Sequence, residues 1–402
     1  MCEHWKFLHA ADLRLGHSFG CHWFASSELH RRIADSPYRA WERLVETAID
    51  QRVDALLLAG NVLDPRTCGA YALGRLEAQF RVLHDAGIPV YWALGELDRR
   101  AHWSARPPWP ANVTVFEEPT WERRTLSCDD RRLELAGRAW SARHGQRSWP
   151  AKSDADVPLV VLASVAPEKL PASPAGTYWA MGGLEQPHDI DSDTADIHYC
   201  GALQPVTPTG GHQGSATLVQ IGLDGDVQWQ RLPLSPLVVL HRRHRLVLHA
   251  SADGQQAFNA LRDDLVADLS HLRRELAQSE TSVDTWLVEY HLEQVPPQLA
   301  WRLADPAVER RLLEQCTQEV DPPRVVPTRL LVESVQAPTS MPPSGTLLAD
   351  LWHELEAARE STVQEWPLAR WPAEFSGLEQ PSSDTVVSQS KSWTLAVISK
   401  TA

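Results

Sequence analysis

Short apolar runs alternate with stretches of helical periodicity in the first half of the chain, and this alternation constrains the fold more than any other feature. It is typical of β-α units stacked around a mostly parallel sheet. Trp41, Leu44 and Val45 recur on one helical face after Ser36-Pro37, which predicts a helix that begins at this pair. The same pattern predicts strands over 6–11, 55–59 and 89–94, and a second helix over 67–86.

Each of these three strands is followed by a loop that carries polar or acidic residues, at 12–14, 60–64 and 95–98. The carboxyl ends of parallel strands meet at one edge of a sheet, and the active sites of open α/β sheets form there. The sequence therefore predicts that these three loops come together and form the functional site.

The pattern of apolar residues changes twice in the rest of the chain. Shorter strands follow the three loops, and a hairpin around Asp224-Gly225 completes a predicted second sheet that packs on the first. Near residue 235 a β-α-β-like pattern begins, with strands over 238–249 and 285–293 around a helix over 255–277. A short helix after Asp305-Pro306, a strand over 330–335, a helix over 347–359 and a polar, Ser-rich end complete the prediction. We therefore predict a main domain at 1–235, a smaller domain at 236–345, and a C-terminal helix with a polar tail at 346–402.

The charge balance limits the classes of partner. The chain has 52 acidic and 38 basic residues, for a formal net charge of −14, which argues against a protein that coats nucleic acid. The six cysteines form no CxxC pair, and the N-terminus enters strand-like sequence without a signal-peptide pattern, so we expect a reduced, cytoplasmic setting. No apolar run approaches the length of about 20 residues that crosses a bilayer, so we expect a soluble protein without membrane contact.

Six motifs resemble those of one family in their order and spacing. Residues 7–16, 60–64 and 95–98 resemble the Asp-x-His, Gly-Asp-x-x-Asp and Gly-Asn-His-Asp motifs of calcineurin-like metallophosphoesterases, in the SbcD-like and YhaO-like branch of bacterial DNA-repair exonucleases. Residues 161–164, 178–185 and 201–204 resemble further motifs of that family. The resemblance is strong up to about residue 235. It implies an α/β fold, a four-layer metallophosphoesterase β-sandwich flanked by helices, followed by a smaller C-terminal α/β capping domain.

The resemblance also implies which residues stand at the metal site. Asp12 keeps the first aspartate of the family, and Asp64 and Asp98 keep two residues that mainly brace the loops. The remaining positions depart from the family: Arg14 replaces a metal-binding histidine, Asn61 the bridging aspartate, Glu96 an asparagine ligand, Leu97 the catalytic-type histidine, and Ala163, Gly183 and Glu185 three later histidines.

These departures matter for the chemistry of the family. Two divalent ions roughly 3.5–4 Å apart clamp a phosphodiester and activate a water, and they need a bridging carboxylate among Asp, His and Asn ligands. Loss of the bridging charge and of the imidazoles removes most of the binding free energy for a metal pair. Leu97 cannot protonate a leaving group. We therefore expect a vestigial site without a cofactor, whereas an active protein would use Mn²⁺ or Mg²⁺.

Arg14 suggests how the site is held together without metal. It puts a permanent cation where a metal-binding histidine would lie, and we hypothesise that it pairs with Asp12, Glu96 or Glu185. In a competing interpretation, Asp12, Asn61, Glu96 and Glu185 form a rebuilt, oxygen-rich site for one Mg²⁺ or Mn²⁺. In a third, the substitutions are simply tolerated in a cleft that no longer carries chemistry.

The preferred function is a non-catalytic scaffold or partner-binding subunit. The partner in the family is an SbcC-like coiled-coil ATPase, which is reached partly through helices near the C-terminus. An apolar stripe suits either such a partner or the chain's own core; its residues are Leu347, Leu348, Leu351 and Leu355.

Two alternatives stay open, together with a homodimer. One is an active metal-dependent phosphodiesterase or DNA exonuclease, and the other is a DNA-end-binding module that does not cleave. Arg242, Arg243 and Arg245, on a predicted strand of the second domain, are candidate phosphate contacts, although such charges also protect a strand edge.

Overall fold

The computed structural model describes residues 4–17, 27–105, 107–128, 131–142, 149–150, 152, 154, 156–171, 176–192, 195–205, 213–246, 254–277, 283–319, 325–333 and 353. The chain divides into two compact units, the first comprising Met1–Leu240 with Glu280–Trp286, and the second His241–Ser279 with Leu287–Ala402. The segment limits expected from the sequence, at 235 and 345, remain predictions. Within the described ranges, no helix is long and apolar enough to span a membrane.

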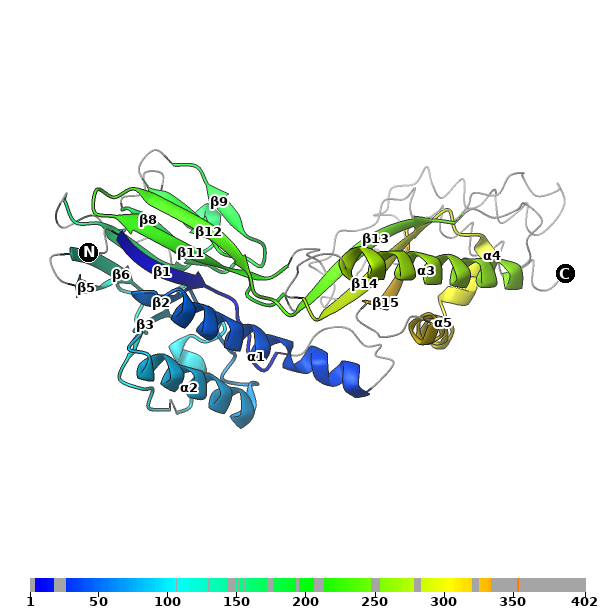
Figure 1. Ribbon diagram of the computed structural model, residues 1–402, viewed down its shortest axis with the longest axis horizontal. Coiled ribbons are helices and arrows are strands. Elements are labelled where there is room, and N and C mark those ends of the chain that lie inside the picture. Colours follow the sequence, from blue (N-terminus) through cyan, green and yellow to red (C-terminus); the bar gives the residue numbers. More distant parts are fainter. Residues whose placement is uncertain are drawn as a thin grey trace. The chain divides into compact units, whose positions relative to one another are not determined.

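The first unit contains a mixed six-stranded sheet in the order β12-β11-β1-β2-β3-β4 (Figure 1). Four neighbouring strands are parallel, and a hairpin pairs antiparallel to β1. The hairpin turns through Gly225, which has a φ of 87°. The parallel strands are β1 (His4–Ala10), β2 (Ala55–Leu58), β3 (Val90–Ala93) and β4 (Val113–Phe116), and the hairpin is β11 (Ser215–Gly222) with β12 (Val227–Pro233).

Two helices, α1 (Ser27–Asp50) and α2 (Gly69–Asp85), pack against one face of this sheet. Their apolar stripes supply Trp41 and Phe80, whose rings meet edge to face at 5.7 Å between centroids. Leu8 of β1 and Leu56 of β2 belong to the same buried cluster. The helical periodicity of the sequence therefore marks the side chains that fill the space between helices and sheet.

The predicted start of α1 is wrong. Ser36-Pro37 does not cap the helix; the helix begins at Ser27 and carries Pro37 in its interior. Proline has no N–H to donate to the carbonyl four residues earlier, which is that of Ile33. The Ser36 hydroxyl donates to this carbonyl at 2.8 Å instead. The serine hydroxyl thus replaces the backbone hydrogen bond that the proline cannot form inside the helix. The same Ser-Pro pair often stands at the start of a helix instead.

A second six-stranded sheet lies in the order β5-β6-β7-β8-β10-β9. The strands β6, β7, β8 and β10 are parallel neighbours, and β5 and β9 pair antiparallel at the two edges. The bounds are β5 (Glu122–Cys128), β6 (Arg131–Gly137), β7 (Leu159–Ser164), β8 (Tyr178–Gly182), β9 (His188–Ile190) and β10 (Asp196–Tyr199). The 3₁₀ turns η1 (Arg100–His102) and η3 (Pro167–Lys169) lie in the connections.

The two sheets pack face to face, as the sequence predicts. Phe7 and Leu57 of the first sheet and Leu135, Leu162 and Tyr178 of the second share one buried cluster. Residues that alternate with these on the second sheet form another cluster on its outer face, where they pack against Trp121, Trp149 and Leu170 in the described part of the chain. The first unit is therefore a β-sandwich with α1 and α2 on the face of the first sheet.

The second unit holds three helices and most of a three-stranded sheet in the order β13-β14-β15. The strand over 285–293 matches its prediction, whereas the third strand begins five residues earlier than predicted. The predicted helix over 347–359 lies outside the described residues, apart from His353. The bounds are β13 (Leu237–Arg245), α3 (Gly254–Ala277), β14 (Thr285–Glu293), α4 (Pro297–Leu303), α5 (Pro306–Glu319) and β15 (Val325–Val332).

Candidate functional site

The loops that follow β1, β2 and β3 come together at the carboxyl edge of the first sheet. The backbone N–H groups of Asp12, Arg14 and Leu15 donate to the carbonyls of three consecutive residues of the next loop, Gly60, Asn61 and Val62, at 2.9–3.0 Å. The first loop therefore continues the pairing of the sheet beyond the end of β1, and this places the side chain of Asp12 against that of Asn61.

The backbone of these loops is strained at the residues that face one another. Asp12, Arg14 and Asn61 have φ angles of 50°, 46° and 54°, in the left-handed region that non-glycine residues seldom adopt. The loops also approach too closely for a side chain at Gly95, where a Cβ would lie 2.5 Å from the Asn61 backbone nitrogen. Such strain gathers at functional sites because the surrounding structure holds it in place.

Asp12 is fully buried and each of its carboxylate oxygens is hydrogen-bonded. Its Oδ1 accepts from the Asn61 amide at 2.9 Å and from the Arg14 guanidinium at 3.3 Å, and its Oδ2 accepts from the Gly183 backbone N–H at 3.0 Å. Burial raises the pKa of Asp12, while these three donors favour the charged form. The structure thus pairs Arg14 with Asp12, one of the three partners that the hypothesis names.

The contacts of Asn61 fix the orientation of its amide. Its Oδ1 accepts the backbone N–H of Leu97 at 3.0 Å, and its Nδ2 donates to the Asp12 carboxylate. Because a backbone N–H only donates and a carboxylate only accepts, the opposite orientation would lose both bonds. The nitrogen end of Asn61 therefore faces Asp12, and its oxygen is taken by the loop after β3.

Asp98 ties the second and third loops together. Its oxygens accept the backbone N–H groups of Asn61 and Val62 at 3.2 and 2.8 Å, the Trp92 indole N–H at 3.1 Å, and the N–H of Gly95 at 2.5 Å. Burial raises the pKa of Asp98 to about 6 despite these four donors. Asp64 lies nearer the surface and forms an ion pair with Arg66 at 2.7 Å. The contacts of Asp98 join two loops, whereas the ion pair of Asp64 lies within its own loop, and the bracing role that the family resemblance implies for both residues stays a prediction.

The structure corrects one residue of the predicted site. Ala163 lies in the apolar cluster on the outer face of the second sheet. The next residue of β7, Ser164, points toward the loops instead: a Cβ added at Gly60 would lie 2.8 Å from the Ser164 Cβ, and one added at Gly183 would lie 3.1 Å from its Oγ. Side chains on a strand alternate between its two faces. The prediction was therefore one residue off, and it named the residue that faces the apolar cluster, Ala163, and not the one that faces the loops, Ser164.

The other predicted residues lie at the margin of the site. Glu96 is exposed, Leu97 is half-buried and contributes its backbone N–H, and Gly183 contributes its N–H to Asp12. Glu185 is half-buried, and its carbonyl accepts the N–H of Ala202 at 2.8 Å. These contacts are made mainly by the backbone.

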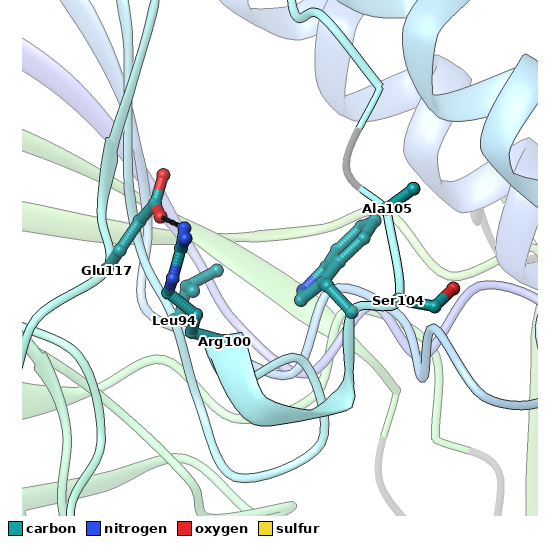
Figure 2. Close-up of a pocket in the computed structure, with 6 residues that line it drawn as sticks. Leu94, Arg100, Ser104, Ala105 and Glu117 are labelled. Atoms are coloured by element: carbon teal, nitrogen blue, oxygen red, sulfur yellow. Dashed lines mark hydrogen bonds and ion pairs between the residues drawn. The ribbon is translucent and has the colours of Figure 1, made fainter.

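A small pocket lies beside the third loop (Figure 2). The ion pair between Arg100 and Glu117 lines it, together with Leu94 and Trp103. Its volume of about 140 Å³ is well below the 300–1,000 Å³ typical of small-molecule sites, so it supports no ligand assignment.

Two arginines of the predicted basic stretch on β13 bond to other side chains of the second unit. Arg242 forms an ion pair with Asp268 of α3, and the Arg245 guanidinium donates to the Gln294 side chain at 2.7 Å. Arg243 is exposed. Contact of this stretch with phosphates stays a prediction.

Two curated proteins are similar to this chain in sequence. YhaO of Bacillus subtilis, described as an uncharacterized metallophosphoesterase, is 30% identical over 215 residues, which are 49% of this chain and 53% of YhaO. The DNA double-strand break repair protein Mre11 of Aeropyrum pernix is 27% identical over 316 residues, which are 70% of this chain and 71% of Mre11. These similarities support the calcineurin-like metallophosphoesterase superfamily and, within it, the branch of YhaO and Mre11.

The similarity covers only part of the chain or of its relatives. The chain spans about half the length of YhaO. No protein-family model matches it. Among solved structures, the phosphoesterase YfcE of E. coli is 16% identical, covers 57% of this chain and 100% of its own, and has a TM-score of 0.26. A dimetal phosphatase of Danio rerio is 12% identical, covers 57% of this chain and 99% of its own, and has a TM-score of 0.32.

The metal pair of a metallophosphoesterase does not fit the residues present at this site. The guanidinium of Arg14 already neutralises Asp12, and Asn61 turns its nitrogen, which cannot coordinate a cation, toward the place of a bridging ligand. Asp98 directs its oxygens to four N–H groups. The side chains of Asp12, Asn61 and Asp98 are thus engaged in hydrogen bonds within the loops, and no reaction step through a metal pair follows from them.

Proposed function

We propose that this metallophosphoesterase-like chain is catalytically degenerate and serves as a non-catalytic scaffold or partner-binding subunit. One observation carries the proposal. The Arg14 guanidinium and the Asn61 amide both donate to Oδ1 of Asp12, the aspartate that the family resemblance assigns to the metal site. A fixed cation and a hydrogen-bonded amide can replace the charge of an ion, but they cannot activate a water molecule.

The loss of proton donors supports the same proposal. Leu97 stands where the family has its catalytic-type histidine, and an alkyl side chain transfers no proton. Ser164 is the β7 residue that faces the loops, and its hydroxyl offers no ligand comparable to an imidazole. Neither Leu97 nor Ser164 therefore replaces an imidazole as a proton donor to the leaving oxygen.

The relationship to Mre11, which is named as a DNA double-strand break repair protein, supports a place in a DNA-repair assembly. We propose that the partner is a coiled-coil ATPase of the SbcC kind, bound through the C-terminal segment. Size-exclusion chromatography of the chain with the purified ATPase from the same source tests this. We expect a complex with the full chain and none with a chain that ends at residue 345.

Hydrolysis assays test the catalytic part of the proposal. The purified chain is incubated with Mn²⁺ or Mg²⁺ and either bis-p-nitrophenyl phosphate or linear duplex DNA, next to an active metallophosphoesterase. Asp12→Asn, which keeps the size of the side chain, is the matched control. We expect equal background rates for the wild type and Asp12→Asn; a metal-dependent rate that Asp12→Asn abolishes would overturn the proposal.

A further inference from the structure

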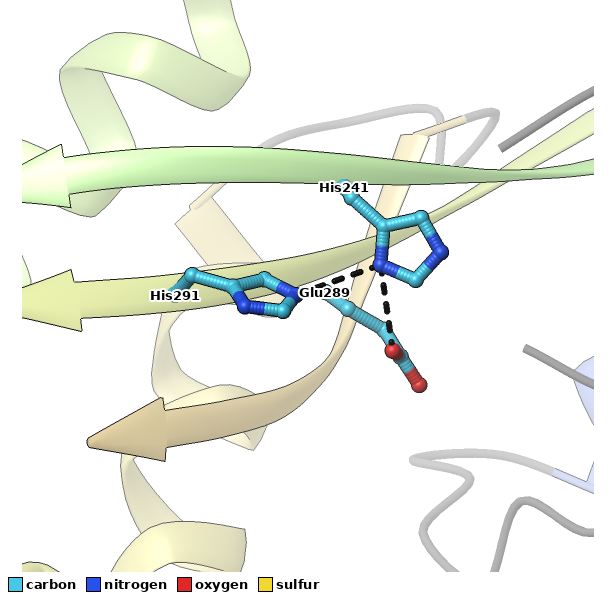
Figure 3. Close-up of side chains that lie close together, drawn as sticks. All are labelled: His241, Glu289 and His291. Atoms are coloured by element: carbon cyan, nitrogen blue, oxygen red, sulfur yellow. Dashed lines mark hydrogen bonds and ion pairs between the residues drawn. The ribbon is translucent and has the colours of Figure 1, made fainter. Parts of the chain in front are cut away.

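A cluster in the second unit, independent of the proposed function, carries three metal-ligand side chains. His241 lies on β13, and Glu289 and His291 lie on β14, one strand away and two residues apart (Figure 3). Residues two apart on a strand face the same side, so all three side chains meet on one face of the sheet. Arg242 and Tyr290, which alternate with them, bond to Asp268 of α3, so the cluster faces away from that helix.

Two of the three distances between the ligand atoms match the edges of a tetrahedral zinc site. His241 Nδ1 lies 3.2 Å from His291 Nε2 and 3.4 Å from Glu289 Oε2, and the three ligand atoms all lie within 4.8 Å of one another. Zinc bonds of about 2.05 Å place tetrahedral ligands about 3.3 Å apart. The side chains are therefore already spaced to hold one ion.

A fourth residue prepares His291 for coordination. Its Nδ1 lies 2.6 Å from a Glu333 carboxylate oxygen. Because a carboxylate only accepts, Nδ1 carries the proton, and the neutral ring presents an unshared electron pair at Nε2 toward His241 and Glu289. A carboxylate behind a coordinating histidine is the usual arrangement around protein-bound zinc, where it orients the ring and increases its basicity.

The buried carboxylate of Glu289 is not accounted for by a proton on His241 alone. The Glu289 side chain is only 3% exposed, and its Oε1 has no hydrogen-bond partner among the residues that the structure describes. A proton on His241 Nδ1 would satisfy one contact, to His291 or to Glu289, and would leave Oε1 unpaired. A divalent cation would satisfy both imidazoles and the carboxylate at once. The guanidinium of Arg329 on β15 also interacts electrostatically with the Glu289 carboxylate.

We propose that His241, Glu289 and His291 bind one Zn²⁺ ion, with the fourth coordination position left to water or an external ligand. Two imidazoles and one carboxylate suit zinc, whereas Mg²⁺ and Ca²⁺ prefer oxygen ligands throughout. The ion joins β13 to β14 through their side chains. The site lies within the second unit and involves none of the residues around Asp12.

Calorimetry with ZnCl₂ on the chelator-treated full chain tests the site, and the visible absorption of bound Co²⁺ reports its geometry. We expect one Zn²⁺ per chain, tetrahedral Co²⁺ bands, and a higher Tm in zinc. His241→Ala and His291→Ala, which change partly exposed side chains, should abolish all three. Glu333→Gln should weaken binding by about 10–100-fold while the stoichiometry stays at one.

Two control variants separate this site from ordinary surface histidines and from the loops of the first unit. His271 lies on α3 beside Glu275, an exposed histidine–carboxylate pair with a separation of 3.5 Å. His271→Ala and Asp12→Ala should bind zinc like the wild type. Circular dichroism of each apo variant checks that it is folded. Absence of stoichiometric zinc binding, or binding that persists in a folded His241→Ala/His291→Ala chain, would overturn the assignment.

Discussion

The guanidinium of Arg14 pairs with the buried carboxylate of Asp12, so substitution of Arg14 should act mainly through that one carboxylate. Arg14→Ala leaves a buried carboxylate without its cation, and we expect it to lower the free energy of unfolding by about 2 kcal/mol at pH 7. Burial already raises the pKa of Asp12, and loss of the guanidinium raises it further. The folded variant then binds a proton more readily than the unfolded chain, so its deficit should shrink as the pH falls toward 4.

Urea unfolding at the two pH values measures this deficit, with Arg66→Ala as the control. Arg66 pairs with Asp64 at the surface, where solvent screens the charges, so its removal should have the smaller effect at pH 7. An Arg14→Ala deficit that stays constant with pH would mean that Asp12 does not depend on the guanidinium.

His9 should make the stability of the first unit sensitive to acid. It is fully buried, with Nδ1 3.0 Å from the Tyr178 hydroxyl, and burial, aided by His198, lowers its pKa well below 6.5. Below about pH 6.5 the unfolded chain takes up a proton that the folded chain does not, so the free energy of unfolding falls with falling pH. In His9→Gln we expect this slope, measured by urea unfolding between pH 7 and 5, to be shallower by up to about 1.4 kcal/mol per pH unit. Parallel slopes would rule out His9 as the source.

At the scale of elements, α1 depends on one hydrogen bond from a side chain to its backbone, between Ser36 and Ile33. Ser36→Ala removes the donor to the Ile33 carbonyl and should lower the free energy of unfolding by about 1 kcal/mol. In a Pro37→Ala chain, the restored N–H at 37 can take that carbonyl, so the same serine substitution should then cost less than about 0.5 kcal/mol. A double-mutant cycle by chemical denaturation measures the coupling; equal costs in both backgrounds would contradict this account of the helix.

Gly182 of β8 lies against the backbone of Ala59, the residue that follows β2 in the first sheet. A Cβ there would lie 1.9 Å from the Ala59 carbonyl oxygen, so we expect Gly182→Ala to destabilise the first unit by more than about 3 kcal/mol. Gly74 in α2 is the matched control because a Cβ there meets no atom within 4 Å. Gly74→Ala should raise the free energy of unfolding by about 0.5–1 kcal/mol. Thermal and urea unfolding of both variants compare the two, and a tolerated Gly182→Ala would argue against the close approach.

The sequence predicted the elements that carry a strong apolar pattern and missed those that lack one. The strand over 285–293 was predicted with its true bounds, because apolar residues recur along it. The edge strand β5 was missed because Leu126 is its only buried residue, and its other side chains are polar or charged. The three-residue β9 and the seven-residue α4 are too short to show a period.

At the scale of the whole molecule, motif order predicted the superfamily and the meeting of three loops, because both depend on residues next to the strand ends. From the sequence, Asp12 was one of three possible partners of Arg14, and only the fold showed which carboxylate the guanidinium pairs with. It did not identify Ser164, although the two-residue period of β7 carried that signal. The cluster of His241, Glu289 and His291 joins positions 50 residues apart, which no spacing rule connects before the strands are paired.

Calorimetric titration of Mn²⁺ tests the central claim, that the loops around Asp12 hold themselves together without metal. It is best done in a His291→Ala chain, so that the second unit contributes no site, with His291→Ala/Asp12→Ala as the reference. The account predicts the same heats for both proteins, with no saturable Mn²⁺ site. A micromolar site that is present in the first protein and absent from the second would contradict it.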